Sequence, residues 1–336
     1  MKTSRQKVMD VFERKNSGEG VMWTGDPDRE IVEAASKAWG IECTNEALFQ
    51  FFDDDCRRIQ ADWGYKRGTN PIDTSYGLPP KKSHNEGGCF AEVETVAEID
   101  AYPWPDVNDC DFIDVYNEID KFQDKMVFTG MWGCFFHQVA DFFGMQNYFI
   151  NMYEAPKLVE AATEHLVDWY VASNEKFFEG LGDRADVMFF GNDFGTQLDL
   201  FMSPEMFRKF VLPGFKRIIA VAKKYNKKVL LHSCGSIYRI IPDLIEAGVD
   251  AIHPIQAAAA GMSATDLAPF KNDISFVGGI DAQTFFVNST PDEIAREVDR
   301  VRSILGPNIV ISPSHERILP NIPIENLRAM AIAAKK

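Results

Sequence analysis

Two side chains that could bind a metal ion stand two positions apart just after an apolar run. The run covers residues 229–231, and His232 and Cys234 follow it. A short run of this kind is typical of a buried strand, in which residues i and i+2 point to the same side. An imidazole and a thiolate suit Zn²⁺. The pair therefore forms half of a candidate zinc site, although spacing alone is weak evidence for a metal, because a Cys is often a small buried apolar residue.

Further polar side chains follow other predicted strands. His315 follows the last of them and is the candidate third zinc ligand, although a hydrogen-bonded loop histidine or a substrate contact is an equal alternative. Water, substrate, Asp193 or Glu316 could take the fourth position, and these two carboxylates are the candidate catalytic residues. The side chains expected to line a substrate pocket are Trp132, Asn192, Phe194, His253, Gln256 and Asp281.

Short apolar strands alternate with helical segments from about residue 113 onward. The predicted strands cover residues 126–130, 187–190, 229–232, 251–254, 275–278 and 309–312, with two earlier candidates at 20–24 and 58–63. No Gly-x-Gly-x-x-Gly element or phosphate-binding loop accompanies them. We therefore expect a (β/α)8 TIM barrel that spans residues 1–336 as a single domain, with its chemistry at the carboxyl ends of the strands.

Residues 64–112 do not follow this alternation of strands and helices, and they are rich in Gly, Pro, Asn and Asp. A long excursion in a compact domain is usually a lid or a binding loop, so we expect it to lie over the barrel mouth. Asp53, Asp54 and Asp55 precede it. They could form a cation site or a solvated, helix-capping cluster.

Charge and cysteine content limit the classes of function. The chain has 336 residues, a formal net charge of −15 and no Lys/Arg-rich run, which argues against a nucleic-acid partner. Its six cysteines form no CxxC pair, and no apolar signal region follows the N-terminus. No stretch reaches 18 consecutive apolar residues, so we expect no membrane span. These features predict a cytoplasmic protein with reduced thiols.

Three stretches of the sequence carry a family resemblance. They are Gly-Asn-Asp-Phe-Gly-Thr-Gln with Met-Ser-Pro-Glu-Met-Phe at 191–197 and 202–207, Leu-His-Ser-Cys-Gly at 231–235, and Phe-Val-Gly-Gly-Ile-Asp at 276–281. With them the chain resembles the uroporphyrinogen decarboxylase superfamily, and within it the cobamide-dependent methyltransferases. The resemblance runs over most of the chain and is strongest after residue 185. It is specific for the superfamily and less so for the reaction.

The resemblance implies a zinc ion held by the His-x-Cys pair and a later Cys. This chain has no Cys after 234, and its late loop at 312–316 reads Ser-Pro-Ser-His-Glu, so His315 is the candidate for the third place. The cobamide is expected on a separate corrinoid protein, because no Asp-x-His-x-x-Gly signature is present. Decarboxylases of the superfamily carry arginines on the first strand that bind substrate carboxylates, and residues 21–26 contain none.

The resemblance and the ligand set together predict a zinc-dependent methyltransferase. It would move a methyl group between a small methylated compound, an ether, amine or thiol, and the cobalt of a corrinoid protein. A Lewis acid on the heteroatom assists transfer in either direction. A site of two histidines and one cysteine keeps a net positive charge, which favours demethylation of the donor. Asp193 would orient a ligand or protonate the leaving group.

Two other interpretations stay open from the sequence. The chain could be a decarboxylase of a porphyrin-like acid, with Asp193 or one of Asp53, Asp54 and Asp55 assisting protonation. It could also be a non-catalytic barrel that binds a small molecule or a cobamide partner. The chain could also form a homodimer.

Overall fold

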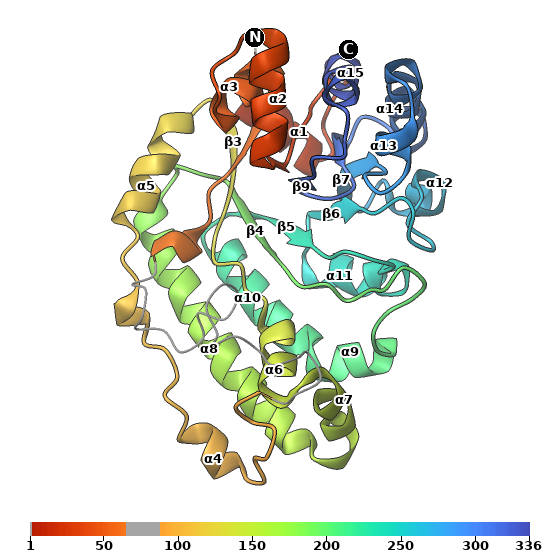
Figure 1. The fold of residues 1–336 in the computed structure, drawn as a ribbon. Helices are drawn as coiled ribbons and strands as arrows, with labels where there is room; N and C mark the ends of the chain where they lie inside the picture. The colour runs from red at the N-terminus through yellow and green to blue at the C-terminus, as the bar shows by residue number, and fades with distance from the viewer. Residues whose placement is uncertain (1, 65–87) are drawn as a thin grey trace.

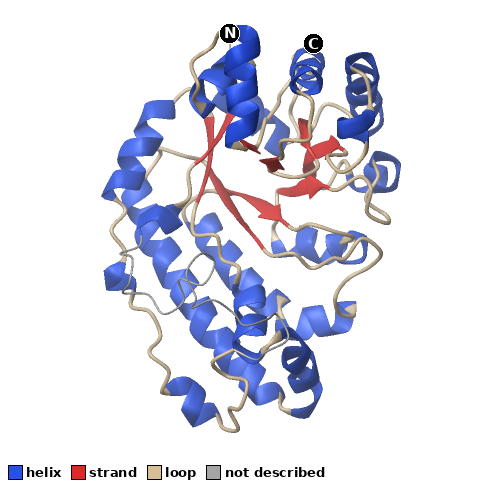
Figure 2. Cartoon of the chain, viewed as in Figure 1, coloured by secondary structure: helices blue, strands red, loops and turns tan. Residues whose placement is uncertain are grey.

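A curled parallel sheet forms the centre of the computed structural model, which describes residues 2–64 and 88–336 (Figure 1). The strand order is β2-β3-β4-β5-β6-β7-β8, with every neighbouring pair parallel. Helices surround the sheet (Figure 2). This is the arrangement of a TIM barrel and confirms the predicted fold class. The strands are β2 (Cys56–Arg58), β3 (Met126–Thr129), β4 (Val187–Gly191), β5 (Lys228–His232), β6 (Ala251–Ile255), β7 (Ser275–Ile280) and β8 (Ile309–Pro313).

Residues 20–24, predicted as the first strand, occupy the place between β8 and β2 without forming a regular ladder. Met22 makes an isolated parallel bridge with Ile311. On the β2 side, the Met22 amide donates to Oδ2 of Asp55 at 3.0 Å and the Thr24 amide to Oδ2 of Asp54 at 2.6 Å. Carboxylate side chains thus take amide hydrogens that a neighbouring strand would accept in a ladder, which explains why the predicted strand is reduced to a bridge.

The second predicted strand, at 58–63, was placed too late in the chain. β2 begins at Cys56, and its pairing with β3 starts where the Met126 amide donates to the Asp55 carbonyl at 2.9 Å. The chain then enters a 3-10 turn at Ala61–Gly64. Arg58 consequently lies inside the barrel, on the same side as Cys56.

The helices of the described residues lie outside the sheet, and one of them covers the amino-terminal end of the barrel. In α1 (Ser4–Phe12), Val8, Val11 and Phe12 are fully buried in one cluster with inward-facing strand residues. The hydroxyl of Ser275, at the start of β7, donates to the Val11 carbonyl at 2.7 Å. α1 therefore closes the amino-terminal end of the barrel.

The remaining helices follow the strands along the chain. They are α2 (Arg29–Trp39), α3 (Asn45–Phe51), α4 (Val96–Asp100), α5 (Ile113–Ile119), α6 (Phe135–Phe143), α7 (Met145–Glu154), α8 (Pro156–Leu181), α9 (Pro204–Phe210), α10 (Leu212–Lys224), α11 (Ile241–Ala247), α12 (Ala264–Leu267), α13 (Phe285–Asn288), α14 (Pro291–Leu305) and α15 (Ile324–Ala334).

Two further features were not predicted or are only partly visible. A short parallel pair, β1 (Asp26–Pro27) and β9 (Arg317–Ile318), joins the first barrel segment to the loop after β8. Much of the excursion predicted at 64–112 lies outside the described residues. Its later part is fixed by Phe90, which contacts Phe142 and Phe143 of α6 edge to face and at a tilt. A lid over the mouth stays a prediction.

Asp53, Asp54 and Asp55 precede β2, and two of them together bind residues near both ends of the described chain. Asp55 is fully buried and accepts hydrogen bonds from the Ser4 hydroxyl at 2.7 Å, the Met22 amide at 3.0 Å and the Lys335 ammonium at 2.7 Å. Asp53 is exposed and approaches Lys335 at 3.1 Å. The prediction of a solvated, helix-capping cluster is therefore wrong for Asp54 and Asp55, which are buried, and the protein's own donors occupy Asp55.

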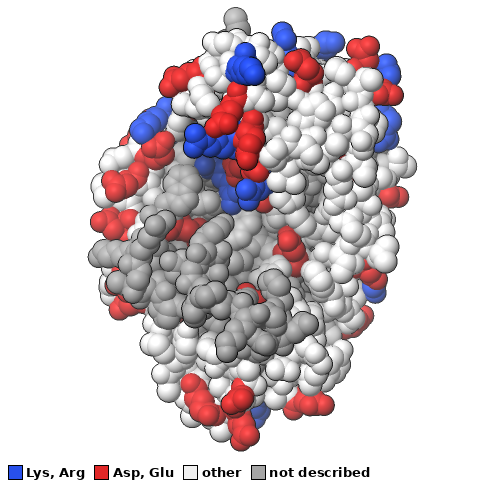
Figure 3. All heavy atoms as spheres, in the orientation of Figure 1, with Lys and Arg blue, Asp and Glu red and all other residues white. Residues whose placement is uncertain are grey.

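On the face shown in Figure 3, acidic and basic side chains lie mainly around the rim and in one mixed group in the upper half. This agrees with the sequence, in which no basic run offsets the acidic residues. Within the described part of the chain, no helix combines the length and apolar character that crossing a membrane requires.

Candidate metal centre at the barrel mouth

The ends of β4, β5 and β6 bring several potential ligands to the inside of the barrel. β5 ends at His232, which pairs in register with Gly191 of β4 and with His253 of β6. Leu230 and Ala251, two residues before each histidine, belong to the interior cluster. Because side chains alternate along a strand, both imidazoles therefore face inward, above the apolar layer.

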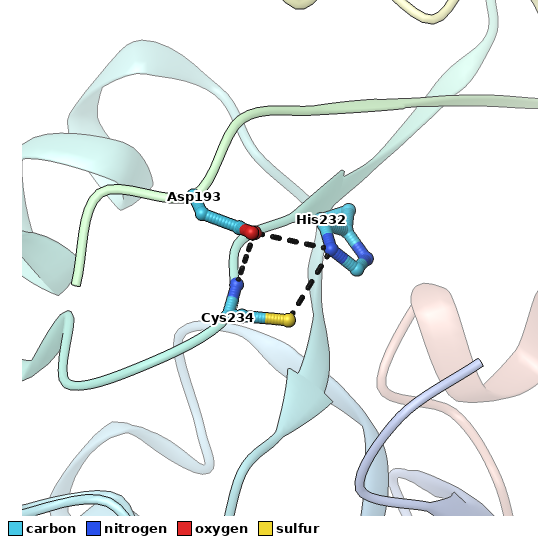
Figure 4. Close-up of side chains that lie close together, drawn as sticks. All are labelled: Asp193, His232 and Cys234. Atoms are coloured by element: carbon cyan, nitrogen blue, oxygen red, sulfur yellow. Dashed lines mark hydrogen bonds and ion pairs between the residues drawn. The ribbon is translucent and has the colours of Figure 1, made fainter. Parts of the chain in front are cut away.

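Three potential ligand atoms lie close together at the barrel mouth, and a ring nitrogen of His232 contacts the other two (Figure 4). Nε2 of His232 lies 3.5 Å from Sγ of Cys234 and 3.2 Å from Oδ1 of Asp193. All three ligand atoms lie within 4.8 Å of one another. His232 is buried, whereas the Asp193 side chain is 42% exposed. The set is therefore open to the mouth on the carboxylate side.

The loops after β4 and β5 are joined to each other, which fixes the spacing of these ligands. The Cys234 amide donates to Oδ1 of Asp193 at 2.8 Å, and the Phe194 amide donates to the Ser233 hydroxyl at 3.0 Å. The Ser236 amide donates to the Thr196 carbonyl at 2.8 Å. Asp193 is thus placed by the backbone that carries Cys234, and the two loops behave as one unit.

Gly235 permits this close approach, so Gly235→Ala is expected to push the ligand loops apart. Its φ is +81°, and a Cβ there would lie 2.2 Å from the Gly195 carbonyl oxygen. The left-handed conformation alone costs a non-glycine residue about 1–3 kcal/mol. We expect a lower Tm and at least a roughly tenfold weaker zinc affinity, as is typical when the support of a ligand is lost.

Gly306→Ala is the matched control for Gly235→Ala. Gly306 also has a φ of +81°, but a Cβ there would meet no other atom within 4 Å. This variant should lose stability and keep its zinc affinity, which thermal melting and zinc titration would establish. Equal zinc affinities of the two alanine variants would contradict the role assigned to Gly235.

Burial and neighbouring charges set the protonation of the three ligands. Burial disfavours the charged imidazole of His232, but Glu316 and the hydrogen bonds to Asp193 and Cys234 outweigh it and hold the pKa of His232 well above its usual value. Burial also opposes ionisation of Asp193, yet the His232 contact lowers the pKa of Asp193 well below its usual range. Burial raises the pKa of the Cys234 thiol. The metal-free site therefore holds protons on His232 and Cys234 and none on Asp193 at neutral pH.

The zinc affinity of this site is consequently expected to rise with pH. A zinc ion needs a neutral imidazole nitrogen and a thiolate, and both groups have raised pKa values, so binding must release up to two protons. Release of one or two protons makes Kd fall by about 10- to 100-fold per pH unit below those pKa values. Competition with a chelating dye between about pH 6 and pH 8 measures the slope. A Kd independent of pH would contradict this ligand set.

A second set of potential ligands lies behind His232, on its other ring nitrogen. Nδ1 of His232 is 3.1 Å from Nδ1 of His253 and 3.6 Å from Oε2 of Glu316. Burial, followed by the charges of His232 and Arg58, keeps the pKa of His253 well below its usual value. Burial opposes the charge on Glu316, but His232 and His315 lower the pKa of this carboxyl. His253 is therefore neutral and Glu316 ionised.

His315, predicted as the third ligand, lies at the edge of these two sets. Its side chain is 47% exposed, and its Nδ1 accepts the Arg317 amide at 3.0 Å and lies 3.8 Å from Oε2 of Glu316. Among the described residues, it does not belong to either group of converging ligand atoms. Ligation through Nδ1 of His315 would require loss of the hydrogen bond from the Arg317 amide, whereas ligation through Nε2 would not.

The other residues predicted for the pocket have different positions: one lies beside His232, one supports the loop that carries Cys234, and three contact other parts of the chain. The Trp132 ring lies 5.2 Å from the His232 ring, centroid to centroid. The Gln256 side chain accepts the Gly235 amide at 2.6 Å and so supports the ligand loop. The other three make internal contacts: Asn192 with Gly133 and His137, Phe194 with neighbouring rings, and Asp281 with the amides of residues 283–285.

Arg58 is a residue of the site that the sequence did not single out. Its guanidinium lies 4.8 Å from the centre of the Trp132 ring and pairs with Asp26 at 2.7 Å. Alternation with Cys56 could have indicated its inward orientation, had β2 been placed correctly.

The chain is similar to proteins of one family. A sequence model of the uroporphyrinogen decarboxylase (URO-D) family matches residues 86–336. The methylated-thiol–coenzyme M methyltransferase of Methanosarcina mazei is 27% identical over 142 residues, which is 40% of this chain and 34% of that protein. The methylcobamide:CoM methyltransferase of Methanosarcina acetivorans is 26% identical over 189 residues, which is 56% of this chain and 52% of that protein. The matched segments thus span about a third to a half of these relatives.

A solved structure shows the same fold. A methyltransferase from Methanosarcina mazei superimposes with a TM-score of 0.70 at 16% sequence identity, and the match covers 99% of this chain and 98% of that one. At this identity the likeness concerns the fold alone.

Proposed function

The chain belongs to the uroporphyrinogen decarboxylase family, and from that premise we propose that it is a zinc-dependent methyltransferase that works with a corrinoid protein. Both curated relatives described above are named methyltransferases, and one is named for methylcobamide. The methyl donor of this chain would be a small methylated ether, amine or thiol.

The observation that carries the proposal is the spacing of the ligand atoms around Nε2 of His232. Tetrahedral zinc with ordinary bond lengths separates a nitrogen and a sulfur ligand by about 3.5 Å, and a nitrogen and an oxygen ligand by about 3.3 Å. The corresponding distances to Cys234 and Asp193 are 3.5 Å and 3.2 Å. Three protein ligands with one open position are typical of catalytic zinc. The two distances from His232 therefore fit the ion, with Asp193 as the proposed third ligand and His315 as the alternative.

Zinc at this position would supply a Lewis acid for the heteroatom that carries the methyl group. Because the pKa of Asp193 is low, this residue is suited to hold the metal or orient a ligand, and not to protonate the leaving group. Trp132 provides an apolar wall beside His232, which suits a small and partly apolar donor. Glu316 contributes a negative charge at the far side of His232.

In the proposed direction the donor loses its methyl group to reduced cobalt on the partner protein. The carbon–heteroatom bond breaks with its electron pair on the heteroatom, which takes up a proton, and the carbon–cobalt bond forms with the electron pair of Co(I). We do not propose decarboxylation of a tetracarboxylate, because the guanidinium of Arg58 inside the barrel is already paired with Asp26.

Methyl transfer from a panel of donors to free cob(I)alamin tests the proposal. The wild type is incubated with methylated ethers, amines and thiols, and methylcobalamin formation is followed by its absorbance, alongside elemental analysis for zinc. We expect about one zinc per chain and turnover of one donor class. Asp193→Asn should lower both.

Asp199→Asn is the control for Asp193→Asn, because Asp199 follows the same strand but pairs with Arg239 at the surface. It should keep its zinc and its rate. Absence of zinc from freshly prepared wild type, or release of CO2 from a porphyrinogen without any methyl transfer, would overturn the proposed function.

A further inference from the structure

His253 lies next to the proposed metal ligand His232, on the side away from Cys234. The proposed function assigns no role to His253. It is 1% exposed and comes from the neighbouring strand, in register with His232. Its ring lies 5.0 Å from the Trp23 ring and 5.4 Å from the Phe189 ring, centroid to centroid. These contacts fix the plane of the imidazole, so its Nδ1 meets Nδ1 of His232 at 3.1 Å.

A metal on Nε2 of His232 determines which atom carries the proton of that ring. A neutral imidazole has one N–H, so coordination through Nε2 leaves the hydrogen on Nδ1. Two acceptors are near: Nδ1 of His253 at 3.1 Å and Oε2 of Glu316 at 3.6 Å. Only the first distance is that of a hydrogen bond. Among the described residues, Oε2 of Glu316 has no hydrogen-bond partner.

We propose that His253 is a positioning residue, which accepts the Nδ1 hydrogen of His232 and thereby aims Nε2 of His232 at the metal. The inference rests on the proposed function, since it assigns the partner of a zinc ligand. Zinc-bound histidines usually donate their other N–H to a carboxylate, a backbone carbonyl or water, and loss of that partner typically weakens metal binding 10- to 100-fold. Here a second imidazole would take that place.

The hydrogen bond also fixes the protonation of His253 itself. Because its Nδ1 accepts, its own hydrogen must lie on Nε2. That Nε2 is buried and has no hydrogen-bond partner among the described residues. The two imidazoles therefore connect the metal position to the buried N–H at Nε2 of His253, in the interior near Trp23 and Phe189.

Zinc affinity in three variants tests the proposal. His253→Leu removes the acceptor, whereas the Oδ1 of His253→Asn can stand near the position of Nδ1. We expect a 10- to 100-fold weaker zinc affinity for the leucine variant and recovery to within a few-fold of wild type for the asparagine variant. Ile255→Val, on the same buried strand, controls for a loss of packing. It should lower the Tm slightly and leave zinc affinity unchanged.

The d–d absorption of the cobalt(II)-substituted protein supplies a readout that packing alone would not move. The band should shift in His253→Leu and return towards wild type in His253→Asn, because the field of the His232 ligand changes. Wild-type affinity in the leucine variant, or equal weakening in both His253 variants, would overturn this inference and leave the proposed function standing. If zinc is lost from the His253→Asn protein but kept in the Cys234→Ala protein, the metal lies on Nδ1 of His232, and this result would also overturn the inference. A wild type that binds no zinc would remove both proposals.

Discussion

Cys234→Ala protein is expected to purify without stoichiometric zinc and to transfer methyl groups at least about a thousand-fold more slowly than wild type. The substitution leaves His232 and Asp193 as two ligands at 3.2 Å from each other, too few for a tight zinc site. A metal Lewis acid contributes several kcal/mol to charge stabilisation in the transition state, and about 4 kcal/mol corresponds to a thousand-fold in rate. Zinc content and methylcobalamin formation measure the two effects.

Cys43→Ser provides the comparison for this variant. Cys43 is an exposed free cysteine between α2 and α3, far in sequence from the ligand loops. It should retain zinc and activity. Full zinc content in the Cys234→Ala protein would exclude Cys234 as a ligand, and a normal rate without zinc would show that the metal is not needed for the reaction.

Asp55→Ala is expected to destabilise the fold by about 3–5 kcal/mol, the cost typical of removing one partner of a buried ion pair. Asp55 is fully buried and accepts bonds from Ser4, Met22 and Lys335. Its loss leaves the partly buried Lys335 ammonium with the exposed Asp53 alone, and the Met22 amide without an acceptor. Chemical denaturation, followed by circular dichroism, gives the free energy of unfolding.

Asp53→Ala is the matched control because Asp53 contacts the same lysine. Its side chain is 72% exposed, and its distance to Lys335 is 3.1 Å. Exposed ion pairs contribute about 0–1 kcal/mol, so this variant should be nearly as stable as wild type. Similar losses for the two variants would mean that burial of Asp55 does not determine its contribution.

The strands and their polar ends were predictable because apolar runs and turn residues are local features of the sequence. The six strands from residue 126 onward lie where the pattern placed them. The first predicted strand differs because the side chains of Asp54 and Asp55 accept amide hydrogens that a backbone ladder would take, and the second begins two residues earlier than the pattern placed it. A periodicity argument does not include such bonds.

The members of the candidate site could be predicted better than their contacts. His232 follows from its place at the end of β5, Cys234 from the loop directly after that strand, and Asp193 from the loop after the neighbouring strand. Which nitrogen of His232 faces Cys234, and which faces His253, depends on how the loops after β4 and β5 pack through Gly195 and Gly235. That packing is a tertiary property, and His315 was predicted as a ligand without knowledge of it.

The closure of the barrel by α1 has a consequence for the kinetics of the proposed reaction. Val8, Val11 and Phe12 fill the amino-terminal end of the barrel, so a small donor and a large corrinoid protein must both use the mouth. A corrinoid protein that docks first would block the donor from the site. We therefore expect inhibition by excess corrinoid protein that a higher donor concentration relieves, and initial rates measured over both concentrations would reveal it. Free cob(I)alamin, which is much smaller, should inhibit less.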